Sequence, residues 1–355
     1  MTLRRSRRLV VLAVAVAMVA LGACDDGSSR ASLPALRPSL EGYRIDYRVE
    51  VHAQGTETSE RHVQVRRPFD GRDASFNPAR TLGSTVLVSN GRHLYGSNGP
   101  SVLDYGERIG TPPGDYRLQP IVADLVRLHL FDKLSRARTV AGRACTVYRT
   151  GAPLGDPFKA PRTTEYVDEC VDRDGLLLAE RWYLHGKLLR DTEATHVDTT
   201  VPGDDAFAPP EGDLQRNPTS FGVVEELTRT RPPKTGLPYW VAPRPPFGFA
   251  LTSRVRAVST SATTGAAQVT DLAYIDTYIR GHDAITVTHR EVGAARAPAR
   301  GVATVHAGAL GAGSVTLSTS GASIAFTADK VVVTVQGPVD IAHLRVFAAA
   351  LRRTR

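Results

Sequence analysis

Apolar and polar residues alternate without exception from Tyr43 to Val51. This two-residue period predicts a β-strand with one apolar face and one face in water. A second strand is expected from His62 to Arg66. Asn90-Gly91 lies between two short apolar stretches and predicts a β-hairpin, because both residues accept a positive φ. The pattern therefore favours neighbouring antiparallel strands in this part of the chain.

Four more strands are expected, at Cys145–Thr150, Thr163–Val171, Leu176–Leu184 and Lys187–Val197. The last three are joined by polar and glycine-containing turns, which connect antiparallel neighbours. Residues 40–205 are therefore predicted to form one domain built on an antiparallel meander.

One helix is expected within this domain, from about Pro120 to Phe131. Its apolar residues recur at helical spacing, and Pro120 suits a first helical turn. They are Ile121, Val122, Leu125 and Leu128, and further apolar residues lie off this face. The helix should therefore be largely buried. It either belongs to the core or covers an apolar concavity, and the sequence leaves both interpretations open.

Prolines are frequent between residues 202 and 246. Such a stretch does not support a regular central strand, so residues 206–245 are predicted to connect two domains. Residues 246–355 are expected to form a smaller second domain of seven strands and a terminal helix. Asp340 is the expected N-cap of that helix, whose apolar face carries Leu344, Phe347, Ala348 and Leu351.

An apolar run from Leu9 to Leu21 follows four arginines near the N-terminus. It is shorter than the roughly 20 residues of a membrane-spanning helix and predicts a signal peptide over residues 1–23. Cys24 directly after Leu21-Gly22-Ala23 resembles the lipobox of bacterial lipoproteins. The resemblance implies a diacylglyceryl anchor on Cys24 and a location on the extracytoplasmic face of the cell membrane. The alternative is an ordinary signal peptide cleaved at a nearby small residue. Residues 24–39 are polar and small and are expected to be a flexible tether.

Charge and cysteine content agree with export. The formal net charge of +8 includes the four N-terminal arginines. A mild positive charge on an exported protein suits an anionic lipid surface rather than nucleic acid, so no nucleic-acid partner is expected. Cys145 and Cys170 remain as an even pair on neighbouring predicted strands, and we expect a disulfide between them. Two buried thiols are the alternative.

The sequence carries no motif of a known catalytic site. It lacks a Gly-x-Ser-x-Gly elbow, and its ten histidines are dispersed rather than spaced as metal ligands. Asp172-Arg173-Asp174-Gly175 lacks the remaining ligands of a calcium loop and is expected to be a turn. We therefore expect no catalytic residue, no metal and no cofactor. An enzyme with an unrecognised site is the alternative.

Several segments resemble a known family of lipid and lipoprotein binders. They are Val140–Arg143, Val171–Leu178, Pro246–Phe249, Leu272–Tyr274, Ile285–Val287 and Val333–Gly337 ahead of the C-terminal helix. In this order they resemble the LolA-like half-barrel and the smaller C-terminal domain of the RseB (MucB) type. The resemblance implies an α+β, mainly antiparallel β fold, with a half-barrel and covering helix followed by a small α+β domain. Two features depart from the RseB type, namely the lipid anchor and the cysteine pair.

The function implied by this resemblance is non-enzymatic. A lipid or an acylated protein would bind in the half-barrel, and the C-terminal domain would regulate envelope signalling through a membrane regulatory protein. The alternative is a lipid or lipoprotein carrier without a regulatory role. The expected pocket residues are those on the apolar faces of the first strand and the helix: Tyr43, Ile45, Tyr47, Val49, Ile121, Val122, Leu125 and Leu128.

Overall fold

A computed structural model gives the architecture of most of the chain. It describes residues 33–53, 55–77, 84–91, 93–107, 111–151, 158–216, 221–231, 233, 237–263, 266–291 and 301–354. Residues Ala35–Arg355 belong to one compact unit. Among the described residues, neither helix has the length and apolar character needed to cross a membrane. Cys24 and the predicted signal peptide lie outside the described residues.

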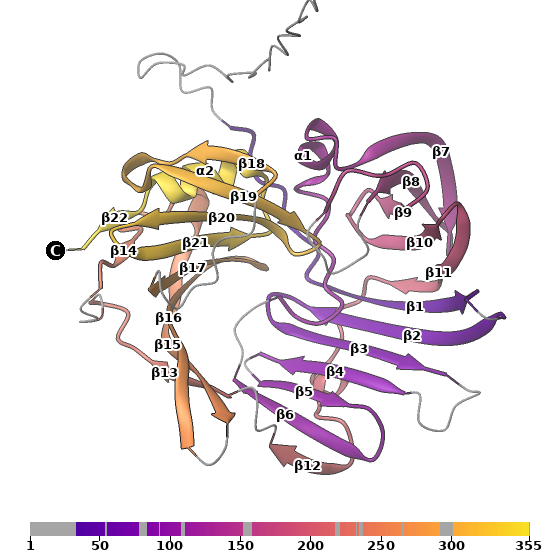
Figure 1. The fold of residues 1–355 in the computed structure, drawn as a ribbon, viewed down its shortest axis with the longest axis horizontal. Helices are drawn as coiled ribbons and strands as arrows, with labels where there is room; N and C mark the ends of the chain where they lie inside the picture. The colour runs from indigo at the N-terminus through magenta and orange to yellow at the C-terminus, as the bar shows by residue number, and fades with distance from the viewer. Residues whose placement is uncertain are drawn as a thin grey trace, which may run out of the picture. The chain divides into compact units, whose positions relative to one another are not determined.

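The larger sheet has twelve strands (Figure 1). They are β1 (Gly42–Val51), β2 (Glu57–Arg66), β3 (Asp70–Phe76), β4 (Thr85–Asn90), β5 (His93–Ser97), β6 (Ser101–Glu107), β7 (Asp132–Val140), β8 (Arg143–Thr150), β9 (Tyr166–Asp172), β10 (Leu177–Leu184), β11 (Lys187–Asp198) and β12 (Asp213–Arg216). Their order is β12-β6-β5-β4-β3-β2-β1-β11-β10-β9-β8-β7. All neighbours are antiparallel except β12, which lies parallel to β6. Strand β1 joins the two wings of the sheet, β2–β6 on one side and β7–β11 on the other.

The second sheet has eight strands, all antiparallel to their neighbours. They are β13 (Phe221–Glu226), β15 (Ala250–Thr263), β16 (Ala266–Arg280), β17 (Asp283–Glu291), β18 (Ala303–His306), β19 (Ala312–Ser318), β20 (Gly321–Ala328) and β21 (Val331–Gly337). Short strands β14 (Trp240–Val241) and β22 (Arg352–Arg353) pair separately. Helix α2 (Ile341–Ala349) packs on this sheet through Phe347, whose ring contacts Phe249 and Tyr278 edge to face. Single turns of 3₁₀-helix lie at Asp204–Phe207, Pro246–Gly248 and Gly308–Leu310.

Several local predictions are confirmed. Strand β1 spans the alternating segment, and β4 and β5 form the hairpin around Asn90-Gly91, where Gly91 has a φ of 85°. Asp340 caps α2, because its side chain accepts a 2.8 Å hydrogen bond from the backbone N–H of His343. The sequence signals were strong at these positions because each depends on residues close together in the chain.

The predicted fold class is wrong. Within the described residues the protein consists mainly of two large, almost wholly antiparallel sheets with two short helices, not an α+β fold with a covering helix and a small α+β domain. The helix expected over Pro120–Phe131 is reduced to α1 (Val122–Arg127), which is six residues long. The second sheet likewise carries a single helix of nine residues, α2.

A tight C-terminal turn explains why α1 is short. His129 adopts a φ of 55°, and its backbone N–H donates to the carbonyl of Val126. The N–H of Leu130 donates to the carbonyl of Leu125 at 2.9 Å. Together these bonds form a Schellman motif, which ends a helix in the left-handed region. Glycine usually fills this position, so His129 gave no sequence signal that the helix stops here.

The predicted connection, residues 206–245, contributes strands to both sheets. Strand β12 extends the larger sheet and β13 extends the second sheet. Loops of the larger sheet also bond to the second sheet and its turns: the N–H of Arg117 donates to the carbonyl of Thr319 at 2.7 Å, and that of Phe158 donates to the carbonyl of Leu317 at 3.1 Å. The domain boundaries at residues 205 and 246 stay predictions.

One buried histidine in the second sheet should make stability depend on pH. His289 on β17 is 2 % exposed, and its ring stacks on Tyr239 with centroids 4.1 Å apart. Burial lowers its pKa from 6.5 to about 4. Between these two values the unfolded chain binds a proton that the folded protein does not. The effect of His289 on the free energy of unfolding should therefore be absent above pH 6.5. It should lower that free energy by roughly 3 kcal/mol as the pH drops to 4.

Replacing His289 should remove its part of the pH dependence of stability. We expect the free energy of unfolding of His289→Gln to fall less steeply between pH 6.5 and 4 than that of the parent protein, by about 1.4 kcal/mol per pH unit. Urea titrations at intervals of half a pH unit measure the slope. The exposed His306 supplies the control, since His306→Gln should keep the parental slope. Equal slopes in parent and His289→Gln would show that folding does not lower the pKa of His289.

Candidate functional site

The predicted pocket residues on β1 lie in the core. Tyr43, Ile45, Tyr47 and Val49 share the inner face of the larger sheet and are each at most 5 % exposed. The Tyr43 hydroxyl donates to the carbonyl of Gly114 at 2.9 Å, and the Tyr47 hydroxyl donates to that of Leu177 at 2.7 Å. Neighbouring chain segments therefore cover this part of the inner face.

The predicted residues around α1 belong to the same core. Ile121 and Leu125 are fully buried, and Val122 and Leu128 are partly buried against the same cluster. Val122 also lines a cavity, described below. The structure thus brings all eight predicted residues together, in a region filled mainly by the chain's own side chains.

An open cavity lies farther along the inner face. This inner-face pocket has a volume of about 480 Å³. It is lined from one wing by Arg61, Asp73, Ser75, Thr85, Val86, Leu87, Gly96, Ser97, Asn98, Leu103 and Tyr105, and from the other wing by Glu180, Trp182 and Arg190. Because both wings contribute to one cavity, the sheet curls around it. Its volume is within the range of small-molecule binding sites.

Apolar side chains make up part of the wall of the inner-face pocket. Leu87, Leu103, Tyr105 and Trp182 line it, and Leu87 is 41 % exposed. A leucine exposed inside a cavity costs free energy that an apolar ligand recovers when it covers the side chain. The pocket therefore suits a ligand with an apolar portion.

The cations that line the inner-face pocket are held in fixed positions. Arg61 donates to both carboxylate oxygens of Asp73, at 2.8 and 2.6 Å, and this pairing balances its charge. The guanidinium of Arg190 lies 5.3 Å from the ring centre of Trp182, in a cation–π arrangement. These groups give the pocket a polar rim beside its apolar wall.

A buried acidic pair lies beside the inner-face pocket. In the sheet register, Val49 is opposite Thr192, Thr192 opposite Glu180, Glu180 opposite Glu169, and Glu169 opposite Tyr148. Residues directly opposite each other share a face, so this cross-strand row lies on the inner face with Val49. Glu169 is fully buried and Glu180 is 1 % exposed.

The surroundings of Glu169 favour the protonated form of its carboxyl group. Burial and the neighbouring charge of Glu180 raise the pKa of Glu169 well above its usual value. Both carboxyl oxygens of Glu169 lack a hydrogen-bond partner among the described residues, as does the hydroxyl of Thr192. Unpaired buried polar atoms are costly in a folded protein and often mark functional sites.

A second cavity lies on the other side of the acidic pair. This α1 pocket has a volume of about 360 Å³ and is lined by residues of β7–β9 together with Gln119, Val122 and Arg173. Its wall includes Tyr148, which is opposite Glu169 in the register. Glu169 therefore lies between two cavities on one face of the sheet, and Glu180 lines the larger of them.

Sequence reasoning missed both glutamates, although the sequence carried a signal. Glu169 stands between Val167 and Val171, and Glu180 between Leu178 and Trp182, at positions that share a strand face. A carboxylate within an otherwise apolar face is unusual and indicates either a buried pair or a site.

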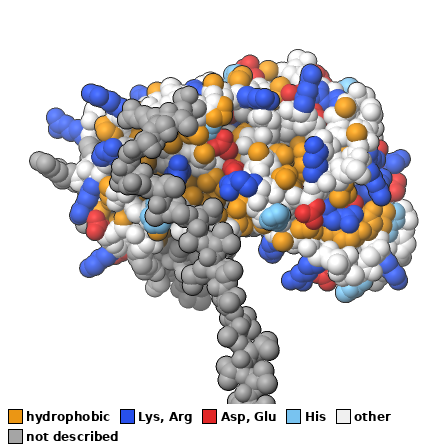
Figure 2. Space-filling model, turned by 90° about the horizontal axis from the view of Figure 1, so that it is seen from above, with side chains coloured by type: hydrophobic (Ala, Val, Ile, Leu, Met, Phe, Trp, Pro, Cys, Tyr) orange, Lys and Arg blue, Asp and Glu red, His pale blue; other side chains and the backbone are white. Residues whose placement is uncertain are grey.

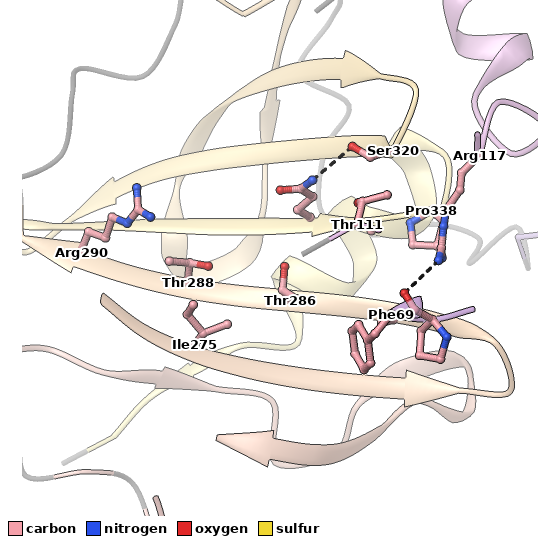
Figure 3. A pocket seen from close by; sticks show the side chains of 13 residues that line it. Phe69, Thr111, Arg117, Ile275, Thr286, Thr288, Arg290, Ser320 and Pro338 are labelled. Atoms are coloured by element: carbon pink, nitrogen blue, oxygen red, sulfur yellow. Dashed lines mark hydrogen bonds between the residues drawn. The ribbon is translucent and has the colours of Figure 1, made fainter. Parts of the chain in front are cut away.

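A third cavity lies where the two sheets meet. Its volume is about 190 Å³. Figure 3 shows side chains that line it, among them Thr286, Thr288 and Arg290 of β17 and Phe69 and Arg117 from loops of the larger sheet. Gln336 donates to Ser320 at 3.3 Å across its wall. Arg117 is buried and already pairs with Asp115. This cavity is smaller than the inner-face pocket, and its buried cation is engaged within the protein.

Charge on the surface is mixed. On the face shown in Figure 2, lysine and arginine side chains are scattered among acidic and hydrophobic ones rather than gathered in one basic stripe. Among the described residues, no group of three or more histidine, cysteine, aspartate or glutamate side chains is placed to hold a metal ion.

Comparisons with known proteins add little. No family model matches the chain, and no curated protein matches it. A search of solved structures finds a LolA superfamily protein from Nitrosomonas europaea, with 11 % identity and a TM-score of 0.21, covering 48 % of this chain and 92 % of that one. The match names the superfamily that the sequence resembles. At this TM-score it carries no argument about the fold or function of this chain.

Proposed function

We propose that this protein is a non-enzymatic binding protein that takes the acyl portion of a lipid or acylated protein into the inner-face pocket. The single observation that supports this proposal is an open cavity of about 480 Å³ with Leu87, Leu103, Tyr105 and Trp182 in its wall. Each buried methylene contributes about 0.8 kcal/mol, so a chain of ten carbons binds through apolar contact alone.

The proposed setting is the extracytoplasmic face of the cell membrane, with Cys24 as the lipid anchor. The proposed role is envelope sensing, with the C-terminal part contacting a membrane regulatory protein. One contact favours sensing over a simple carrier. The backbone N–H of Ile341, at the start of α2, donates at 2.7 Å to the carboxylate of Asp124 in α1. Helix α1 borders the α1 pocket, which lies across the acidic pair from the inner-face pocket, and this bond joins α1 to α2 on the second sheet.

Placing a charge in the pocket wall should weaken this binding. The probe is decan-1-ol, titrated by calorimetry into the purified chain lacking residues 1–24, which keeps every element described above. Leu87→Glu should weaken binding at least tenfold, because it replaces apolar contact by a carboxylate and costs about 1.4 kcal/mol or more.

Phe76→Glu is the matched control. Phe76 is an apolar side chain at the end of β3 that is 49 % exposed, and it is not among the residues that line the inner-face pocket. This variant should bind decan-1-ol within twofold of the parent protein. If the parent takes up no decan-1-ol at micromolar protein, or if the two variants bind alike, the proposed function is wrong.

A further inference from the structure

We infer that the polar end of the ligand is a carboxylate and that Arg190, in the wall of the inner-face pocket, binds it. The inference rests on the proposed function and adds to it the chemistry of the head group. Leu87 and Leu103 line the same pocket and would contact the acyl chain. The ligand class is then a fatty acid rather than an acyl chain held in an ester.

The register places Arg190 on the inner face of the larger sheet. Arg190 lies opposite Val51 on β1 and opposite Trp182 on β10. It stands two residues from Thr192 on β11, and side chains two residues apart share a strand face. Arg190 and Trp182 both line the inner-face pocket. A ligand in this pocket therefore meets the arginine directly.

Arg190 has no partner of opposite charge within the described part of the chain. It forms no ion pair there, and its Nε has no hydrogen-bond acceptor. Its guanidinium lies 5.3 Å from the centre of the Trp182 ring, and this contact steadies the cation but supplies no acceptor for its N–H donors. The indole Nε1 of Trp182 is unpaired in the same part of the chain. The wall therefore has a surplus of donors, which calls for an acceptor on the ligand.

The other charged side chains of the pocket limit the ligand to one negative charge. Arg61 and Asp73 neutralise each other through hydrogen bonds of 2.8 and 2.6 Å. Glu180 is engaged within the chain and lines the pocket one row away from Arg190. One cation is thus left for the ligand, while Glu180 repels a second negative charge. This balance favours a carboxylate over a doubly charged phosphate monoester, and Arg190 disfavours an amine.

A carboxylate also matches the shape of the arginine side chain. The planar guanidinium presents two parallel N–H donors to the two oxygens of a carboxylate. Such charge-assisted bonds are roughly twice as strong as bonds between neutral groups. An alcohol offers one neutral oxygen to the same donors. Ligands with equal acyl chains should therefore differ clearly in affinity according to their head groups.

Three probes with the same ten-carbon chain test the inference by calorimetry at pH 7.5: decanoic acid, decan-1-ol and decylamine. The parent protein should bind decanoic acid at least tenfold more tightly than either of the other two. Arg190→Gln should erase this preference and leave decan-1-ol binding unchanged. Arg190→Lys keeps the charge but loses the parallel donors, so its preference should be at least threefold smaller than that of the parent protein.

Lys187→Gln is the matched control. It removes one positive charge from the same strand, at an exposed residue that is not among those lining the inner-face pocket. This variant should keep the full preference for decanoic acid. An equal loss in Lys187→Gln and Arg190→Gln would mean that the net charge of the protein, and not Arg190, selects the head group, and would overturn the inference.

Failure of the inference and failure of the proposed function are distinguishable. Equal binding of the three probes by the parent protein overturns the carboxylate inference and leaves the proposed function standing. If none of the three binds, the proposed function itself fails. Should Arg190→Gln not fold, Arg190→Lys decides, because an undiminished preference in that variant overturns the inference.

Discussion

Replacing Asp115 by alanine should lower the free energy of unfolding by about 3–5 kcal/mol. Its fully buried carboxylate accepts a 3.0 Å hydrogen bond from Nε of Arg67 and another from Nε of Arg117. Burial opposes ionisation of Asp115, but Arg117 and Arg67 outweigh it and hold its pKa below the usual range. Without the carboxylate, two buried guanidinium groups lose the charge that balances them.

Urea denaturation at pH 7 measures this loss. Glu165→Ala is the control, because the ion pair of Glu165 with Arg162 joins side chains that are 40 % and 78 % exposed. Exposed pairs of this kind contribute less than about 1 kcal/mol. A loss below 1 kcal/mol for Asp115→Ala would mean that water reaches the two arginines.

Removing the disulfide should have the second largest effect. The structure joins Cys145 on β8 to Cys170 on β9, as expected from the sequence, and both side chains are buried. The two cysteines are 25 residues apart, so the bond limits the unfolded chain and contributes about 3.5 kcal/mol on the chain-entropy model. The double variant Cys145→Ala, Cys170→Ala should lose about this amount in urea denaturation.

The reduced parent protein separates the cross-link from the packing of the side chains. With the thiols kept reduced, its unfolding midpoint should approach that of the double alanine variant. If the reduced protein is as stable as the oxidised one, the bond adds nothing and the loss in the variant comes from packing alone.

Local patterns in the sequence predicted strands, turns and one helix cap well. The alternation of β1, the Asn90-Gly91 hairpin and the Asp340 cap each depend on residues within a few positions of one another. The predicted extent of helix α1 was wrong. A run of apolar residues does not show where a helix stops when His129 fills a position that glycine usually occupies. The predicted fold class was wrong for the same reason, because the expected cover over the inner face depended on a longer helix.

The inner-face pocket could not be predicted from the sequence. Its walls come from the strands β2–β6 and from β10 and β11, which are distant in the chain. Whether an apolar face is open or filled depends on which loops reach it. Tyr43 and Leu87 both belong to strands with an apolar face, yet one is fully buried and the other 41 % exposed.

The contacts between segments distant in the chain have a consequence for folding during synthesis. Ser39 forms a hydrogen bond with Asp283, which lies 244 positions later in the chain. Asp124 forms one with Ile341, which lies 217 positions later. These bonds form only after nearly the whole chain has been made. Folds rich in such distant pairings acquire their native structure slowly and expose unpaired strand edges meanwhile. Nascent chains of this protein should therefore depend on chaperones until α2 is complete.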